Sequence, residues 1–332
     1  GRAEFFRHID AGSYQYVSGG PINVEILITG GAGFIGSHIL AALQGRPDIQ
    51  VVVFDNLSGG SRDHVPSGME LIEGDICDKD ALDAVFRRHS FSAVVHLAAQ
   101  TMVPFSVEQP IVDCRVNLEG VLQVLEGCRT YKVPHILFSS SAAVYGDNLN
   151  IPLEEGERLL PTSPYGVTKM TTEHYLRVYH ELYGLDATVF RFANVYGERQ
   201  GEKGEGGVVS IFCKLLSENQ GLTVYGDGKQ TRDFVYAGDI AQAIIRALPL
   251  TGYHTINVST GTETSVNELI ESFEKAVGHA VSVDYKDARP GDIMRSVLSN
   301  KTLESLLSFV PPTDLAEGIR RTYEWYRSAA SK

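Results

Sequence analysis

The stretch from Ile26 to Gly36 constrains the fold of this chain more than any other. It joins a short apolar run to a cluster of glycines, and an amphipathic segment follows at once. The glycines fit two spacings, G-x-x-G-x-x-G (Gly30, Gly33, Gly36) and G-x-G-x-x-G (Gly31, Gly33, Gly36). Because glycine has no Cβ, such a strand–turn–helix unit lets backbone N–H groups and a helix N-terminus approach a pyrophosphate. The stretch therefore predicts a dinucleotide site, although glycine turns also serve packing alone.

Asp55 ends the next apolar run, about 20 residues beyond the glycine turn. An acidic side chain there binds ribose hydroxyls and disfavours a 2′-phosphate, so it predicts NAD rather than NADP. The alternatives stay open: Asp55 is also a common turn residue before Asn56, and nearby Arg62 can accept a 2′-phosphate. The other predicted cofactor positions are Phe34, Ile35, Asn56, Asp75, Ile76, Leu97, Ala98 and Ala99. Among these, Asp75 is equally typical of a helix cap.

Short β-rich runs alternate with helical patterns between residues 24 and 192. This alternation is typical of a parallel sheet covered by helices on both faces. The predicted strands are Val24–Thr29, Gln50–Asp55, Glu70–Glu73, Ala93–Leu97, His135–Ser139 and Ala187–Phe192. The predicted helices are Ile35–Gln44, Lys79–Arg88, Ile111–Thr130 and Pro164–Tyr183. We therefore predict an α/β fold, a Rossmann-type doubly wound parallel sheet, with its ligand at the carboxyl ends of the strands.

The regular alternation weakens after about Tyr196, and we expect a smaller C-terminal substrate-binding domain there. Residues 198–207 are rich in glycine and charge, which indicates a mobile loop. A helix over Val208–Glu218 and strands over Leu222–Tyr225 and His254–Val258 are expected to follow. The predicted domains are 24–195 with 234–259 for NAD, and 196–233 with 260–330 for the substrate. Residues 1–23 are predicted to be an extension without an assigned role.

Composition and charge exclude several classes of function. The 332 residues are 43% hydrophobic, enough for a large core, and the formal net charge is −12 with no basic block. This balance argues against nucleic-acid binding. No apolar run approaches the ~20 residues of a membrane span, and the N-terminus lacks the order of a signal peptide. The four cysteines have no metal-ligand spacing, so we expect reduced thiols, no metal and a cytoplasmic protein.

Three residues downstream of the turn carry the predicted chemistry. Ser141 follows the fifth predicted strand, and Tyr165 and Lys169 lie four residues apart on one face of a predicted helix. A tyrosine normally titrates near 10, and we expect Lys169 and a cationic nicotinamide to lower the Tyr165 pKa. Ser141 is then placed to bind the same substrate oxygen. Each residue alone is common in turns or on helix surfaces, but together they predict a catalytic set.

These motifs resemble the extended short-chain dehydrogenase/reductase family, most closely its nucleotide-sugar epimerases of the UDP-glucose 4-epimerase type. The resemblance runs from about Val24 to the C-terminus and includes residues 54–58, 139–146, 163–169, 191–197, 231–235 and 289–292. It implies a UDP-sugar substrate, tightly held NAD and a homodimer. It also implies that Asn194, Arg232 and Arg289 bind the diphosphate and that Tyr225 lies beside the uracil. The remaining substrate positions that it implies are Val208, Asp292 and Ser296, the last beside the C2 substituent of the sugar.

The resemblance also narrows the reaction. Related 4,6-dehydratases carry an Asp–Glu pair directly after the catalytic Ser or Thr, where this chain has Ala142 and Ala143. Uronate decarboxylases carry a glutamate in this stretch, and uronate 4-epimerases tend to have a threonine at the place of Asn194. The reaction that is left is oxidation and re-reduction at C4 of a UDP-hexose. A UDP-uronate or another nucleotide sugar is the alternative substrate. A reductase that exchanges NAD each turn and a non-catalytic NAD sensor are the rival functions.

Overall fold

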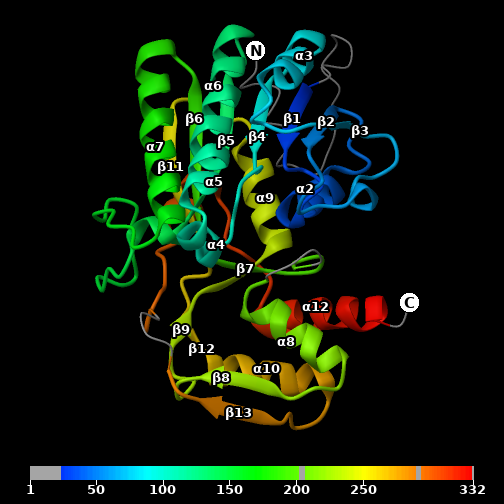
Figure 1. Cartoon of the computed structure of the whole chain (residues 1–332), viewed down its shortest axis with the longest axis vertical. Coiled ribbons are helices and arrows are strands. Elements are labelled where there is room, and N and C mark those ends of the chain that lie inside the picture. The colour runs from blue at the N-terminus through cyan, green and yellow to red at the C-terminus, as the bar shows by residue number, and fades with distance from the viewer. Residues whose placement is uncertain (1–23, 202–205, 289–292, 331–332) are drawn as a thin grey trace. The chain divides into compact units, whose positions relative to one another are not determined.

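The computed structural model describes residues 24–201, 206–288 and 293–330. The chain forms two compact units (Figure 1). Unit 1 contains residues 24–146, 159–191 and 241–256, and the described parts of 147–158, 192–240 and 257–330 form unit 2. These boundaries differ from the predicted domains, chiefly because residues 147–158 join unit 2. The assignment of NAD binding to one domain and substrate binding to the other stays a prediction.

Unit 1 is built on a seven-stranded sheet in the order β11-β6-β5-β4-β1-β2-β3. The strands are β1 Val24–Thr29, β2 Ile49–Asp55, β3 Glu70–Glu73, β4 Ala93–His96, β5 His135–Ser141, β6 Asp186–Phe192 and β11 Tyr253–Val258. β1 pairs in parallel with both β2 and β4. The strand order therefore reverses at β1, which is the switch point where doubly wound sheets bind ligands. The predicted fold class is confirmed.

The helices of the sheet follow the predicted pattern closely. They are α2 Phe34–Leu43, α3 Lys79–Arg88, α4 Val103–Glu108, α5 Pro110–Cys114, α6 Val121–Thr130, α7 Pro164–Tyr183 and α9 Ala237–Ala247. α3, α6 and α7 lie side by side (Figure 1) and close a core with the strands. Ser163 accepts a hydrogen bond from the Gly166 N–H at the start of α7, and left-handed Gly184 ends that helix. Such end signals explain why its predicted bounds hold.

The helix predicted over Ile111–Thr130 is interrupted by a π-helical turn, Arg115–Gly120, between α5 and α6. Asn117 in this turn is buried. Its Nδ2 donates to the Gln100 carbonyl at 2.9 Å, and its Oδ1 accepts from the Gln100 N–H at 2.9 Å. The wider turn therefore directs an amide side chain onto the loop after β4. Single π turns inside α-helices occur frequently at functional sites.

Unit 2 has a core of its own, formed by helices over three short strand pairs. The helices are α8 Val208–Ser217, α10 Val266–Val277, α11 Lys301–Leu307 and α12 Leu315–Ala330. The strand pairs join β7 Asn194–Tyr196 to β10 Phe234–Tyr236, β9 Thr231–Arg232 to β12 Thr264–Ser265, and β8 Leu222–Tyr225 to β13 Val283–Lys286. Phe212 and Phe273 meet edge to face inside this core, at 5.8 Å between ring centroids. In the described ranges, no helix is long and apolar enough to cross a membrane.

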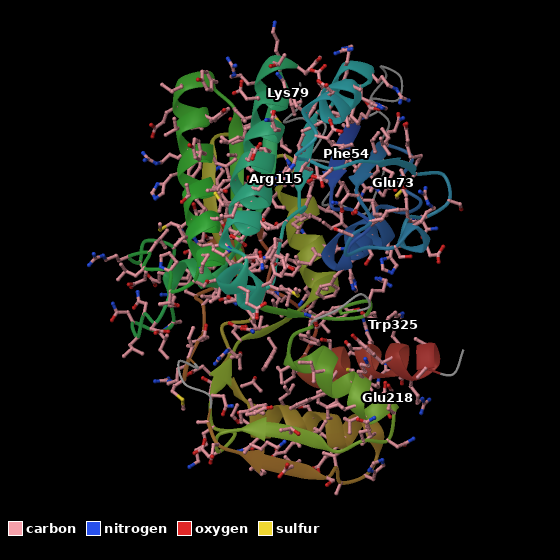
Figure 2. The ribbon with its side chains drawn as sticks, in the orientation of Figure 1. Phe54, Glu73, Lys79, Arg115, Glu218 and Trp325 are labelled. Atoms are coloured by element: carbon pink, nitrogen blue, oxygen red, sulfur yellow. The ribbon has the colours of Figure 1, made fainter. Side chains whose placement is uncertain are left out.

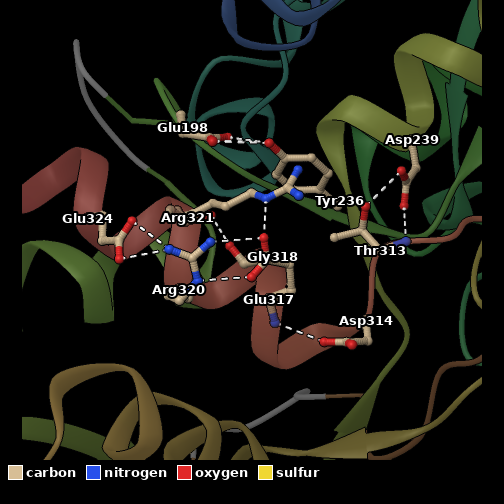
Figure 3. A network of polar contacts seen from close by, with 11 residues as sticks. Glu198, Tyr236, Asp239, Thr313, Asp314, Glu317, Gly318, Arg320, Arg321 and Glu324 are labelled. Atoms are coloured by element: carbon tan, nitrogen blue, oxygen red, sulfur yellow. Dashed lines mark hydrogen bonds and ion pairs between the residues drawn. The ribbon is translucent and has the colours of Figure 1, made fainter.

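A polar network ties the start of α12 to the rest of unit 2 (Figure 3). Arg321 donates to Glu317 at 2.6 Å and lies over the Tyr236 ring at 5.8 Å. The Tyr236 hydroxyl in turn donates to Glu198 at 2.9 Å. The α12 backbone also lies against a side chain of β7 here, because a Cβ at Gly318 would lie 1.9 Å from the Tyr196 hydroxyl. The ion pairs of this network are partly exposed, unlike the buried pair of Glu173 and Arg191 in unit 1.

Candidate active site

Two glycines of the turn are required by packing. Gly30 has φ +70°, and a Cβ there would lie 2.5 Å from the Ala98 N atom of the loop after β4. At Gly36, a Cβ would lie 2.5 Å from the Gly31 Cα atom, inside the turn itself. Larger residues at either position would push α2 or the β4 loop away from β1. Gly30 and Gly36 therefore have a packing role in this motif, and the cofactor roles predicted for Gly30, Gly33 and Gly36 stay predictions.

Gly33 has no such structural demand. It precedes α2 with an ordinary φ of −79°, and no side chain caps that helix. A Cβ at Gly33 would meet only the Gly30 carbonyl oxygen within 4 Å, at 3.2 Å. The first N–H groups of an uncapped helix attract an anion, and a missing side chain lets it approach closely. The turn therefore fits the pyrophosphate of a dinucleotide, with Phe34 and Ile35 in the first helical turn.

We expect Gly33→Ala to fold normally but to retain NAD about tenfold more weakly or worse, because the new methyl group faces the pyrophosphate. NAD released from the denatured, purified protein measures retention, and thermal unfolding reports the fold. Gly30→Ala is the control: its left-handed backbone costs about 1–2 kcal/mol before any clash, so we expect it to lower the melting temperature instead. Unchanged NAD content in Gly33→Ala would contradict this assignment.

Asp55 lies beside the glycine turn, as the NAD prediction requires. Its Oδ2 accepts the Ala32 N–H at 2.9 Å, and its Oδ1 accepts the Leu57 N–H at 2.8 Å. The turn role of Asp55 is thus present in the structure. An ionised carboxylate has further acceptor positions, so ribose binding stays compatible with these bonds and remains a prediction.

The remaining predicted cofactor residues follow β2, β3 and β4 at the carboxyl edge of the sheet. Asn56 Nδ2 donates to Asp75 Oδ2 at 3.1 Å, which joins two of them directly. Ile76 follows Asp75 and is buried. Leu97, Ala98 and Ala99 continue from β4, and the Leu97 N–H donates to the Thr29 carbonyl at 3.0 Å.

Arg62, the residue that raised the NADP alternative, pairs with Glu73 at 2.6 Å. Glu73, labelled in Figure 2, ends β3. In the strand register it lies opposite Asp55. The Arg62 guanidinium is therefore engaged by an acid of the neighbouring strand. Both side chains are more than half exposed, so this ion pair is weak. The selection of NAD by Asp55 stays a prediction.

Ser141 and Tyr165 lie together at the end of β5. Ser141 is half-buried and accepts the Ala143 N–H at 3.1 Å. Tyr165 is buried, and its N–H donates to the Ser106 hydroxyl at 3.1 Å. Burial raises the pKa of the Tyr165 phenol to about 12, a hydrogen bond with Ser141 opposes this shift, and the charge of Asp113 adds to it. Burial therefore sets the direction of the shift in the protein without NAD. The lowering expected when the nicotinamide is bound stays a prediction.

Lys169 lies one turn further along α7 and is 3% exposed. Its Nζ donates to the Ser139 carbonyl at 2.8 Å and lies 5.7 Å from the centroid of the Tyr165 ring. Burial lowers the pKa of Lys169 to about 8, while Asp113 and Glu173 act in the opposite direction. The three predicted catalytic residues are thus close together at the carboxyl end of β5.

Several buried polar residues around this set were not predicted. Asp113 on α5 accepts a hydrogen bond from Thr168 at 2.9 Å, and Glu173 pairs with Arg191 at 2.6 Å. His96 is also buried, and burial with the charge of Lys169 lowers its pKa to about 3. The one available signal was helical spacing, which puts Glu173 on the same face as Lys169. Among the described residues, no group of three or more His, Cys, Asp or Glu side chains is arranged to hold a metal.

The substrate residues implied by the resemblance belong to unit 2. Asn194 is exposed, and its N–H donates to the Asp233 carbonyl at 2.9 Å, next to Arg232. Arg232 Nη1 donates to the Ile293 carbonyl at 2.7 Å, which brings the segment of half-buried Ser296 alongside. Tyr225 ends β8, and Val208 begins α8. Arg289 and Asp292 lie outside the described residues.

Comparison with known proteins identifies the family of this chain. The profile of the NAD dependent epimerase/dehydratase family matches residues 26–259. A UDP-glucose 4-epimerase of Mycolicibacterium smegmatis is 38% identical, across 92% of this chain and 99% of the relative. The structure of Thermotoga maritima UDP-glucose 4-epimerase with UDP-glucose is 37% identical with a TM-score of 0.89, across 92% of this chain and 100% of that one. The structure of a UDP-N-acetylglucosamine 4-epimerase of Methanobrevibacter ruminantium with UDP-N-acetylmuramic acid is 36% identical with a TM-score of 0.87. It covers 92% of this chain and 99% of that one. The chain therefore belongs to the NAD dependent epimerase/dehydratase family, and NAD, the cofactor predicted from its glycine turn, is confirmed.

Proposed function

We propose that this protein is a UDP-hexose 4-epimerase that interconverts UDP-glucose and UDP-galactose through a transient 4-keto sugar. The observation that carries the proposal is the site at the end of β5, where Ser141, Tyr165 and Lys169 meet and alanines follow the serine. Such a site offers a group that moves one hydroxyl proton. It offers no acid at Ala142 or Ala143 for the elimination of water. The relatives named UDP-glucose 4-epimerase support the same reaction.

Each residue of the site has one task in this reaction. The glycine turn would hold NAD, which would supply the hydride acceptor and donor for sugar C4 and a positive charge near the phenol. Tyr165, as phenolate, takes the proton of the C4 hydroxyl and gives it back at the end. The Ser141 hydroxyl donates to the C4 oxygen as it becomes a carbonyl. The Lys169 ammonium favours the phenolate and holds the ribose of the cofactor.

The proposal assigns the UDP moiety to residues of the predicted substrate domain. Asn194, Arg232 and Arg289 would bind the diphosphate, because arginine and amide donors suit its oxygens. Tyr225 would lie beside the uracil, with Val208 in the helix that covers the nucleotide. Firm binding of the diphosphate leaves the keto sugar free to turn over and present its opposite face, so few groups should hold the hexose.

The test is to incubate the purified protein with UDP-galactose without added NAD. We expect UDP-glucose to form with no net NADH, because the cofactor returns to its starting state in every turnover. A reaction that depends strictly on added NAD would instead support a reductase. Turnover of a UDP-uronate in place of the UDP-hexose would overturn the assigned substrate and leave the epimerase chemistry standing.

Ser296 is proposed to set the width of the sugar site, because a small side chain beside C2 leaves room for an N-acetyl group. Its segment contacts Arg232 through the Ile293 carbonyl, and a relative named UDP-N-acetylglucosamine 4-epimerase is 36% identical to this chain. We expect Ser296→Tyr to lower kcat/KM for UDP-N-acetylglucosamine by about 10- to 100-fold and to spare UDP-glucose. Coupled assays with both sugars measure the ratio. A wild-type enzyme inactive on the N-acetyl sugar would refute this assignment.

A homodimer is proposed from the apolar surface of α4, α5 and α7, which pack against one another. Ile111 is 82% exposed, Leu182 67% and Val107 62%, so water covers large apolar side chains on these helices. A second copy of the chain would cover them at the least cost. Light scattering should give the mass of two chains, and a monomer at micromolar concentration would refute the proposal. The cytoplasmic location stays a prediction.

A further inference from the structure

Asp113 is a fully buried acid that the proposed reaction does not use. It lies on α5 and is 0% exposed. Its Oδ1 accepts from Gln100 Nε2 at 2.6 Å and from Asn117 Nδ2 at 3.1 Å, and its Oδ2 accepts from the Thr168 hydroxyl at 2.9 Å. Gln100 and Asn117 donate through amide N–H groups, and the Thr168 hydroxyl, which also lies 3.0 Å from the Tyr165 carbonyl oxygen, is the third partner. Every one of these partners is neutral, so none compensates the charge.

Lys169 is a buried cation whose hydrogen-bond partner is also neutral. The partner of its Nζ is the neutral Ser139 carbonyl, and aromatic rings of Phe138 and Tyr165 lie at 4.9 Å and 5.7 Å. Lys169 directly follows Thr168, which binds Asp113, on a helix that packs against α5, and the charge of Asp113 acts on Lys169. Buried charges are retained where an opposite charge compensates them.

The other charged or titratable groups near Lys169 do not compensate its charge. Glu173 lies one turn along α7, but Arg191 holds it with hydrogen bonds of 2.6 Å and 3.1 Å and balances its charge. His96 of β4 is neutral at pH 7, because burial and Lys169 lower its pKa to about 3. The Tyr165 phenol is neutral at pH 7 in the absence of a cofactor. Among the described residues, Asp113 is thus the acid near Lys169 whose own hydrogen-bond partners are all neutral.

We propose that Asp113 is the counter-ion of Lys169, a positioning residue whose charge keeps the lysine an ammonium at neutral pH. Its hydrogen bonds also join the first turns of α7 to the π turn that carries Asn117. Asp113 contacts neither substrate nor cofactor and acts through Lys169. The inference rests on the role of Lys169 in the proposed function, but Lys169 can be titrated without turnover.

The sign of the effect follows from charge alone. Removal of a negative charge makes it easier for neighbouring groups to lose a proton. Lys169, whose pKa burial lowers to about 8 despite the opposing charges of Asp113 and Glu173, should therefore titrate lower without Asp113. We expect Asp113→Asn to shift this titration down by about one unit. The amide has nearly the size of the acid, and the Thr168 hydroxyl can turn to accept from it.

The experiment follows Lys169 by NMR of 15N-lysine-labelled, NAD-loaded protein, with the signal assigned by Lys169→Arg. Asp113→Glu, which keeps the charge, and Thr168→Val, which removes one hydrogen bond and keeps the charge, are the controls. We expect a downward shift in Asp113→Asn and the wild-type value in both controls. The alkaline limb of kcat/KM should move with it. A shift in Thr168→Val equal to that in Asp113→Asn, or none in either, overturns the proposal.

The wild-type protein keeps the proposal testable where Asp113→Asn does not fold. Lys169 should be an ammonium at pH 7, and a neutral Lys169 there overturns the proposal. Failure of the proposed function looks different: the protein would not epimerise UDP-galactose, yet the Lys169 titration would still depend on the charge at Asp113.

Discussion

Replacement of Tyr165 by phenylalanine is expected to lower kcat for epimerisation by about 10³-fold while the protein stays folded and keeps its NAD. The loss follows because the phenol is the proposed group that moves the C4 hydroxyl proton. The fold should survive because the ring remains, its N–H still donates to Ser106, and Ser141 still accepts from Ala143. The lost Ser141–Tyr165 hydrogen bond should cost only about 1 kcal/mol of unfolding free energy.

Three measurements separate this outcome from its rivals. A coupled assay gives kcat, urea denaturation gives the free energy of unfolding, and NAD released on denaturation gives cofactor content. Undiminished turnover in Tyr165→Phe would remove the phenol from the mechanism. A protein with bound NAD and no epimerase activity before or after the substitution would instead be an NAD sensor.

The pH dependence of Tyr165 gives a direct spectroscopic check. In protein without NAD the phenol should titrate near 12, because burial raises its pKa. With NAD bound, the positive nicotinamide favours the phenolate, so the phenolate absorbance should rise at lower pH. Turnover should increase with pH through the same range, since the phenolate is the active form. Gly33→Ala serves as the NAD-poor protein, and Tyr165→Phe should lack this titration altogether.

Sequence patterns were sufficient where a feature depends on residues close together in the chain. The strand, turn and first helix around Gly30 depend on local backbone geometry, so their bounds and the cofactor NAD were predictable. Ser141, Tyr165 and Lys169 were also predictable as a group, because each lies at a strand end or on one face of a single helix. The carboxyl ends of parallel strands then bring these segments to one edge of the sheet.

Features that depend on contacts between distant segments were not predictable in this way. Asp113 meets Thr168 across 55 residues, and the π turn at Asn117 follows from its bonds to Gln100 on another loop. Periodicity places a residue on a helix face but does not show whether that face excludes water. For this reason the sequence did not reveal the burial that raises the pKa of Tyr165 in the protein without NAD.

Breaking the pair Glu173–Arg191 should cost more stability than breaking any other ion pair described. Both side chains are about 5% exposed, Arg191 donates to both carboxylate oxygens, and Ser140 donates to the same carboxylate at 2.5 Å. Burial opposes the charge on Arg191, but the hydrogen bonds and charge of Glu173 more than offset it and raise its pKa above the usual value. We expect Arg191→Met to lower the free energy of unfolding by about 3–5 kcal/mol, because it leaves a buried carboxylate unpaired.

Urea denaturation of a matched set tests this expectation. The double variant Arg191→Met/Glu173→Met removes both charges and should recover much of the loss, since a buried pair is often replaceable by apolar side chains. Arg320→Met removes the exposed pairs of Arg320 on α12 (Figure 3) and should leave stability nearly unchanged. A double variant no more stable than Arg191→Met would show that the loss comes from packing.

Because the double variant removes equal and opposite charges, Lys169 should titrate close to its wild-type value there. This distinguishes the balanced acid Glu173 from Asp113, whose charge Lys169 alone compensates.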